Sequence, residues 1–217
     1  MDFLVRLLRQ VKGASAAAEP RQAPPSVEPQ PFCKTSPAWQ QLVHRWSPQD
    51  ALSVLDLGCT SSSNFRFFLD RGCHLQHLDL LHELSLDSGD AGQPLTPATI
   101  LADNLSLPMG SLDAILLWDV LDYVPREFIR PLVDQLSLSL RPGGALLALF
   151  HSREAGVNPV SYQFHIQDHE TIEWRPRPAR PILHFFHVRH IENLFSTFHS
   201  IRFFLGHEGT REVLMVR

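Results

Sequence analysis

From residue 39 onward, short apolar runs alternate with amphipathic stretches, a pattern typical of a parallel sheet covered by helices. Five runs predict the parallel strands: residues 53–57, 74–80, 99–102, 112–118 and 145–150. Two more runs, residues 201–205 and 212–216, flank a turn with two glycines and predict a final hairpin. Helices are predicted at residues 64–71, 126–140 and 188–198. The expected fold is α/β, with a seven-stranded sheet that is mostly parallel, a C-terminal antiparallel hairpin and helices on both faces.

The N-terminal part of the chain has a different pattern. Residues 1–12 place five apolar side chains on one helical face and basic side chains largely elsewhere, which predicts a short amphipathic helix. Such a helix is typical of a weak membrane-surface contact, a targeting segment or a partner-binding helix, and the alternative is a mobile or packed terminus. Residues 13–37 are rich in Pro and Ala and predict a linker, so the domain is expected at residues 38–217.

Composition narrows the class of protein. The 217 residues carry 19 Lys plus Arg against 23 Asp plus Glu, a net charge of −4, so we expect no nucleic-acid partner. Three cysteines are too few for a disulfide framework, and the sequence has no long apolar run or signal peptide. A cytoplasmic location is therefore expected.

Small and acidic residues follow the predicted strands. Gly58 opens a loop of small residues after the first strand, where a ligand can approach the backbone closely. Asp56 and Asp79 end the first two strands, and Asp103 and Asp119 follow the third and fourth. Isolated aspartates at such positions are usually helix caps or turn formers. Four of them in register with the strands predict a ligand site at one rim of the sheet, because the carboxyl ends of parallel strands meet there.

At these residues the chain resembles the class I S-adenosylmethionine-dependent methyltransferases, small-molecule type 11-like branch, whose fold is Rossmann-like. The resemblance spans about residues 54–150 and rests on the segments VLDLGC, LADNLSLP, GSLDAILLWDVLDYV and LRPGGALLALF together with the Asp79 strand end. It implies S-adenosylmethionine as cofactor and methyl transfer to a small-molecule acceptor that the sequence does not identify.

The resemblance also implies roles for individual residues. Asp56 and Gly58 are expected at the methionyl part of the cofactor, Asp79 at the ribose hydroxyls, and Asp103 at the adenine. Asp119 is expected near the sulfonium and the acceptor, and His151 is a second candidate for a catalytic role. The full set implied to bind the cofactor is Asp56, Gly58, Cys59, Asp79, Leu80, Asp103, Asn104, Leu105 and Asp119. Trp39 matches the place of an N-terminal helix that covers the cofactor.

The loop departs from the family pattern at two positions. Thr60 and Ser62 stand where the family has its second and third glycines. A non-glycine residue in a left-handed conformation costs roughly 1–2 kcal/mol, so the loop would bind cofactor more weakly unless its φ angles are negative. The alternative function is therefore a catalytically inactive methyltransferase-like protein that serves in binding or scaffolding.

Other chemistry finds less support in the pattern. His184, His187 and His190 are spaced three residues apart, but no carboxylate or thiolate completes a zinc motif, so we expect no metal. His165 and His169 are possible general bases, although methyl transfer needs a base only for some acceptors. Cys59 is expected to be a packing residue rather than a catalytic thiol. The serines after it lack the glycine that a hydrolase nucleophile elbow requires.

Overall fold

The computed structural model describes residues 29–47, 50–59, 61–86, 96–105, 107–153, 160–206 and 209–217. The helix predicted at residues 1–12 lies outside the described residues, and so does the linker up to residue 28. Strand β1 (Phe32–Thr35) lies inside the range expected to be linker. Within the described residues, no helix has the length and apolar character needed to cross a membrane.

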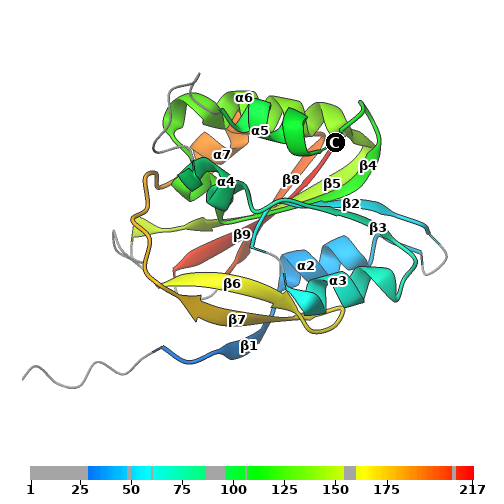
Figure 1. The fold of residues 1–217 in the computed structure, drawn as a ribbon, viewed down its shortest axis with the longest axis horizontal. Helices are drawn as coiled ribbons and strands as arrows, with labels where there is room; N and C mark the ends of the chain where they lie inside the picture. Colours follow the sequence, from blue (N-terminus) through cyan, green and yellow to red (C-terminus); the bar gives the residue numbers. More distant parts are fainter. Residues whose placement is uncertain are drawn as a thin grey trace, which may run out of the picture.

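A six-stranded sheet forms the centre of the molecule, with strand order β3-β2-β4-β5-β9-β8 (Figure 1). The first four strands in this order are parallel, and β9 pairs antiparallel with both β5 and β8. The strands are β2 (Ser53–Asp56), β3 (His74–His77), β4 (Leu112–Trp118), β5 (Leu140–His151), β8 (Ser200–Leu205) and β9 (Thr210–Val216). The predicted α/β sheet with its C-terminal antiparallel hairpin is thus confirmed, with six strands instead of seven.

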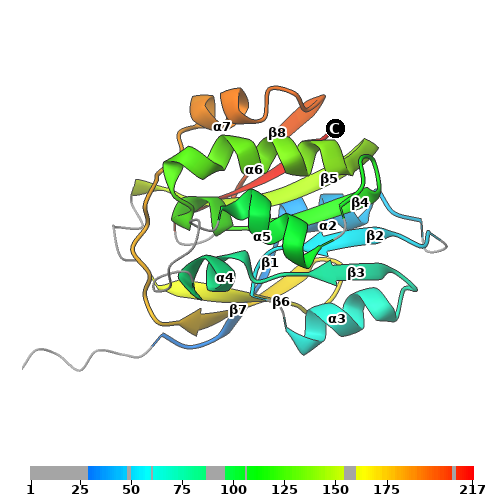
Figure 2. The ribbon, with the colours of Figure 1, turned by 45° about the horizontal axis from the view of Figure 1, so that its top comes forward.

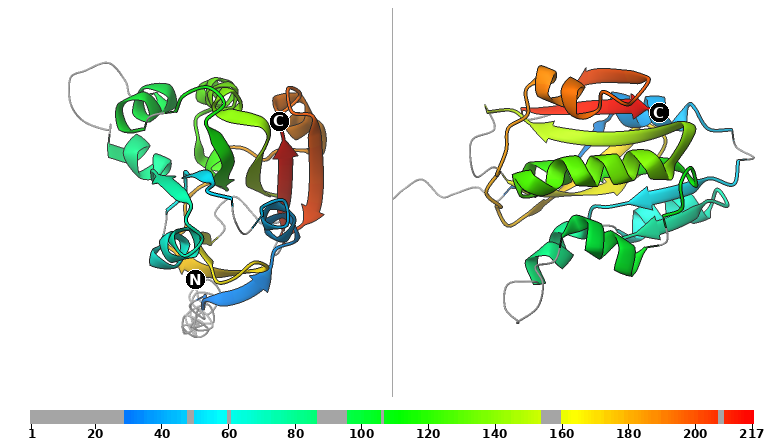
Figure 3. Two further views of the ribbon diagram at one scale, coloured as in Figure 1. Left: turned by 90° about the vertical axis from the view of Figure 1, so that its right-hand side faces the viewer. Right: turned by 90° about the horizontal axis from the view of Figure 1, so that it is seen from above.

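Helices cover both faces of this sheet (Figure 2). Helices α2 (Pro37–Val43) and α3 (Ser62–Leu69) pack on one face; α4 (Leu80–Leu86), α5 (Pro97–Asn104), α6 (Arg126–Ser139) and α7 (Val188–Leu194) lie on the other. Seen from above, α6 runs lengthwise over the strands (Figure 3). Since both faces are covered, most residues of the central strands β4 and β5 are apolar and buried.

Strand β4 contributes side chains to two hydrophobic cores, one on each face of the sheet. All seven of its residues are buried. Ile115 and Leu117 belong to the core beneath α5 and α6, whereas Ala114, Leu116 and Trp118 belong to the core beneath α2 and α3. The alternation follows from strand geometry, in which successive side chains point to opposite faces.

The strand predicted at residues 99–102 is wrong, because these residues belong to helix α5. Thr96 caps the helix by accepting from the backbone N–H of Thr99, the Thr99 hydroxyl accepts in return from the Thr96 backbone, and Pro97 occupies the first turn. This capping box and the N-terminal proline favour a helix start. A short apolar run such as Ile100–Leu101 fits either a strand or a helix, and here the cap decides.

A second sheet is built mainly from residues 161–177, where the sequence pattern predicts no strand or helix. It has three antiparallel strands in the order β1-β7-β6, with β6 at Ser161–Ile166 and β7 at Thr171–Arg177. Figure 1 shows it below the central sheet, on the side of α2 and α3. Phe164, Ile166 and Trp174 face the central sheet and are buried with Trp118. This sheet supplies one wall of the pocket described next.

Candidate functional site

A cavity of about 340 Å³ opens at the carboxyl ends of the parallel strands. Residues from the ends of three strands line it: Gly58 and Cys59 follow β2, Asp79 follows β3, and Asp119 follows β4. An open parallel sheet binds its ligands at this edge, and the volume lies at the lower end of the usual range for ligand pockets. The structure therefore brings four of the expected cofactor-binding residues together in one pocket.

Asp56 lies beneath the pocket and does not line it. Its carboxylate is fully buried and accepts from the indole N–H of Trp118 (2.8 Å), the backbone N–H of Gly58 (3.1 Å) and the side-chain amide of Asn64 (3.3 Å). Burial raises the pKa of Asp56, and these hydrogen bonds oppose the rise. The described contacts of Asp56 thus hold the strand end, the loop and helix α3 together.

Trp118 fills the space above Gly58. A Cβ atom on Gly58 would lie 2.3 Å from Cδ1 of the indole, so a glycine is required there by contact and not by its φ angle. Trp118 has φ 49°, and among the described residues it is the one non-glycine with a positive φ. Its ring stacks on Phe164 with centroids 5.0 Å apart. A bulky residue in this backbone region stores strain, a feature that clusters at functional sites.

The described part of the loop after β2 shows no left-handed residue. Thr60 lies outside the described residues. Ser62 is the first residue of α3, and Ser61 caps this helix by accepting from the backbone N–H of Asn64. The cost expected for a left-handed residue therefore does not arise at Ser62, since its conformation is helical.

Asp79 and Cys59 face the same end of the pocket. Asp79 is half-buried, and its side chain accepts from the backbone N–H of His82 (3.0 Å) in the first turn of α4. Burial raises the pKa of the Cys59 thiol; Arg177 opposes this rise and Asp79 adds to it. The thiol therefore stays protonated and is not an activated nucleophile.

The remaining residues implied to bind the cofactor lie away from the pocket. Leu80 is fully buried in the core, while its neighbour Leu81 lines the pocket. Asp103 and Asn104 are exposed on α5, and Leu105 is packed against the core. The helix in place of the expected strand accounts for this difference, because it moves residues 103–105 off the carboxyl edge.

Asp119 lines the pocket and is 7% exposed. Burial raises its pKa to about 7; the neighbouring His151 lowers the pKa and Asp122 raises it. No described Lys, Arg or His lies within ion-pair distance of Asp119. A carboxyl with a pKa near neutrality can both give and take a proton at physiological pH.

Asp122 and His151 form a buried pair beside Asp119. The Oδ2 atom of Asp122 accepts from the backbone N–H of His151 (2.7 Å) and bonds its ring Nδ1 (2.8 Å). Burial disfavours the imidazolium, but Asp122 and Asp119 outweigh it and raise the pKa of His151. Sequence reasoning gave Asp122 no role, because nothing local links residue 122 to residue 151; two acids three apart after a buried strand were the one available signal.

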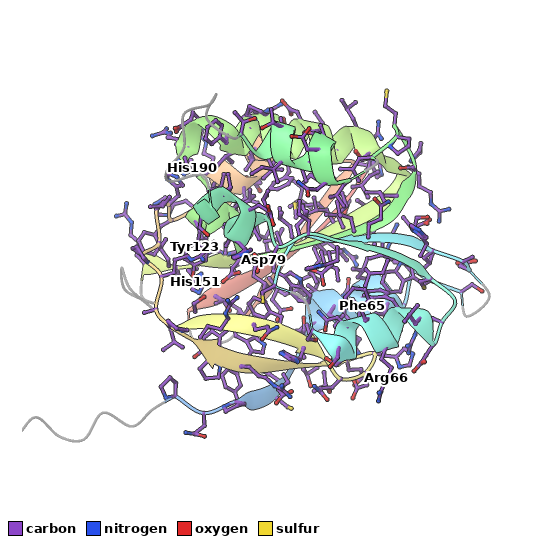
Figure 4. All side chains as sticks on the ribbon, viewed as in Figure 1. Phe65, Arg66, Asp79, Tyr123, His151 and His190 are labelled. Atoms are coloured by element: carbon purple, nitrogen blue, oxygen red, sulfur yellow. The ribbon has the colours of Figure 1, made fainter. Side chains whose placement is uncertain are left out.

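Tyr123 closes this end of the pocket. Its hydroxyl is buried and makes no hydrogen bond of good geometry among the described residues, although the Ser161 side chain is close enough to oppose the rise of its pKa. Burial, with the charges of Asp119 and Asp122, raises its pKa well above the usual range. The guanidinium of Arg180 lies 5.8 Å from the centroid of its ring. Asp79, Tyr123 and His151 are labelled in Figure 4, between α4 and the second sheet.

The wall opposite the strand ends comes from the second sheet and the segment after it. Ser161, Tyr162 and Phe164 of β6 line the pocket, as do Arg177 and Arg180. These two arginines bring positive charge to a cavity whose other side carries Asp79 and Asp119. Sequence analysis missed this wall, although residues 161–166 do alternate polar and apolar side chains.

The other candidates from the sequence lie outside this pocket. His165 is buried on β6, and His169 contacts Arg71 (2.7 Å) in the turn before β7. His184 bonds the carbonyl of Val124, and His187 precedes α7, with its ring 5.5 Å from that of His190. Trp39 is buried against α3 and donates to the carbonyl of Asp168 (2.9 Å). No group of three potential metal-binding side chains occurs among the described residues.

The residues of the pocket fit the cofactor that the resemblance implies. Asp79 offers a carboxylate to hydroxyl groups, and Asp119 offers a buried carboxyl to a cation. The unpartnered Tyr123 hydroxyl is a third polar group that a ligand would satisfy. Trp118 restricts the part of the site next to Gly58.

Comparisons with solved structures match methyltransferases at low sequence identity. A methyltransferase from Mesorhizobium loti, described as S-adenosylmethionine-dependent, is 17% identical to this chain. The match covers 82% of this chain and 97% of the Mesorhizobium chain, with a TM-score of 0.48. The 1,6-didemethyltoxoflavin-N1-methyltransferase of Burkholderia thailandensis, solved with 1,6-didemethyltoxoflavin and S-adenosylhomocysteine, is 14% identical. The match covers 83% of this chain and 75% of the Burkholderia chain, with a TM-score of 0.45.

A curated relative matches part of the chain. The malonyl-[acyl-carrier protein] O-methyltransferase of Enterobacter lignolyticus (strain SCF1) is 30% identical over 93 residues, which are 43% of this chain and 36% of that protein. The match thus spans about a third of the relative's length.

A family model described as "Methyltransferase domain" matches residues 34–198, more than half of the chain. This range includes the central parallel strands, strands β6 and β7 of the second sheet and every residue of the pocket. The match confirms the resemblance found in the sequence motifs. The chain belongs to this methyltransferase-domain family.

Proposed function

We propose that the chain transfers a methyl group from S-adenosylmethionine to a small-molecule acceptor bound in the pocket at the ends of β2, β3 and β4. Its membership of the methyltransferase-domain family supports the reaction. The observation that carries the site is the meeting of Gly58, Asp79 and Asp119, which lie far apart in the sequence, around one cavity. When bound, S-adenosylmethionine supplies an electrophilic methyl group on a cationic sulfur.

Residues in different parts of the pocket have different roles in this reaction. Asp79 binds the hydroxyl groups of the cofactor, and Gly58 and Cys59 form the floor beside it. Asp119 faces the reacting end, with the His151–Asp122 pair behind it. Tyr162 and Phe164 form the wall that excludes water and holds the acceptor. Alignment of acceptor and methyl group is the main catalytic requirement of such a displacement.

Calorimetric titration with S-adenosylmethionine and S-adenosylhomocysteine tests this function. We expect both ligands to bind, and we expect Asp79→Asn to weaken both by tenfold or more, about 1.4 kcal/mol. Asparagine keeps the side-chain oxygen that caps α4, so the loss reports on the charge and not on the fold.

Asp134→Asn is the matched control, because Asp134 is half-exposed on α6 and pairs with Arg130 far from the pocket. It should bind both ligands as the unchanged chain does. Equal losses in Asp79→Asn and Asp134→Asn would contradict the role of Asp79. No binding at millimolar ligand would instead favour the inactive scaffold, which the family match does not favour.

A further inference from the structure

The buried cluster of Asp119, Asp122 and His151 holds two acids and one imidazole, and of these three residues Asp119 is the one that lines the pocket. Asp119 and Asp122 are both less than a tenth exposed, and His151 is the one imidazole bonded to either of them. The Oδ2 atom of Asp122 holds His151, whereas its Oδ1 atom has no hydrogen-bond partner among the described residues. A buried acid without a paired cation is stable mainly in its protonated form.

We propose that Asp119 is a charge-linked base: it releases its proton when the sulfonium of the cofactor enters the pocket, and takes one back from the acceptor as that positive charge disappears. This inference rests on the proposed function. It also names the class of acceptor, a molecule whose attacking atom carries a proton, such as a hydroxyl group.

Asp119 accepts the proton that the acceptor loses in this step. The hydroxyl oxygen forms a bond to the methyl carbon, the carbon–sulfur bond breaks, and its electron pair stays on sulfur. The hydroxyl proton goes to a carboxylate oxygen of Asp119, which is within the same pocket wall as Tyr123. No oxidant or reductant is needed.

The surroundings of Asp119 make it responsive to a ligand charge. The groups that act on it are Asp122 from the turn after β4, His151 at the end of β5, and Arg180 from the segment after β7. Burial and Asp122 favour the protonated acid, while His151 and Arg180 favour the carboxylate. Arg180 lies over the ring of Tyr123 and forms no described ion pair with Asp119, so a cation in the pocket would have a stronger effect.

Titrations over pH separate the cationic cofactor from its neutral product. The two ligands share every group except the methylated sulfur, so their difference reports on the sulfonium charge. We expect the affinity for S-adenosylmethionine to rise up to about tenfold per pH unit below pH 7 and to level off above it. Calorimetry in buffers of different ionisation enthalpy should show release of up to about one proton more than for S-adenosylhomocysteine.

Two variants test the assignment to Asp119. Asp119→Asn should bind both ligands with the same pH dependence, whereas the control Asp134→Asn should keep the difference between them. Asp122→Asn should move the midpoint of the difference to lower pH, because Asp122 acts as a positioning residue whose charge raises the pKa of Asp119.

The outcomes distinguish this inference from the proposed function. Binding of neither ligand overturns the proposed function and the inference with it. Binding of both ligands with one common pH dependence in the unchanged chain overturns the inference alone, and so does a difference that survives Asp119→Asn.

Discussion

Gly58 and Trp118 occupy one space, and each limits what the other residue can be. The indole reaches over the loop to donate to Asp56 and leaves no room for a methyl group on residue 58. Trp118 accepts a strained φ of 49° to do so, which costs of order 1–3 kcal/mol. The packing of Phe164 on the ring and the buried hydrogen bond to Asp56 offset this cost.

A double-mutant cycle measures this contact. Gly58→Ala should lower the free energy of unfolding by about 1–3 kcal/mol, because its new Cβ overlaps the indole. In the Trp118→Ala background the same change should cost less than about 1 kcal/mol, since the overlapping atoms are gone. Urea denaturation of the four proteins gives the coupling. Equal costs in the two backgrounds would show that the loop, and not the indole, rejects a side chain at residue 58.

At the level of elements, helix α2 is fastened to the central sheet by one buried acid. Oε2 of Glu212 on β9 accepts from the hydroxyl of Ser36 (2.8 Å) and the backbone N–H of Ala38 (3.0 Å). Ser36 also caps α2 by accepting from the backbone N–H of Trp39, and its own N–H donates to the carbonyl of Glu170. Ser36 therefore connects α2, the central sheet and the turn of the second sheet.

Substitutions at this junction should be coupled. Glu212→Ala should cost about 2–3 kcal/mol, because it leaves two buried donors without a partner, and Ser36→Ala about 1–2 kcal/mol. The double variant should cost less than the sum, since both changes remove the same hydrogen bond. Chemical denaturation gives the three values; simple additivity would mean that the two residues act separately.

Elements also show where sequence reasoning succeeds and where it fails. The strand at residues 112–118 and the helix at residues 126–140 were predicted almost to their ends, because long buried runs and clear helical periodicity are local properties. Residues 99–102 were assigned to the wrong element because two apolar residues carry no period. Strand β7 was missed because Pro176 and two arginines hide its alternation, and β6 was missed although its residues do alternate.

The whole molecule buries several acids, and this sets how its stability depends on pH. Burial raises the pKa of Asp56, Asp119, Asp122 and Glu212 above their ordinary values. An acid with a raised pKa binds more protons in the folded than in the unfolded chain. Stability from such groups is therefore greatest at acidic pH and is lost as pH rises through the folded pKa.

Asp119→Asn should isolate one of these contributions. The variant should match the unchanged chain near pH 4, where Asp119 is neutral in the folded protein, and exceed its free energy of unfolding by about 2–4 kcal/mol at pH 8. Urea denaturation at the two pH values measures the difference. A gain of the same size at both pH values would mean that the stabilisation does not come from the ionisation of Asp119, and that a change in packing explains it.

The sequence by itself determined the α/β sheet, its antiparallel end and the edge at which Gly58, Asp79 and Asp119 meet, because strand runs and the residues that follow them are local signals. Only the tertiary structure decided that Asp56 and Trp118 bond each other and that Asp122 holds His151. These outcomes depend on which side chains share a buried space. The partners are 62 and 29 positions apart in the sequence, and they come together only when the sheet has formed.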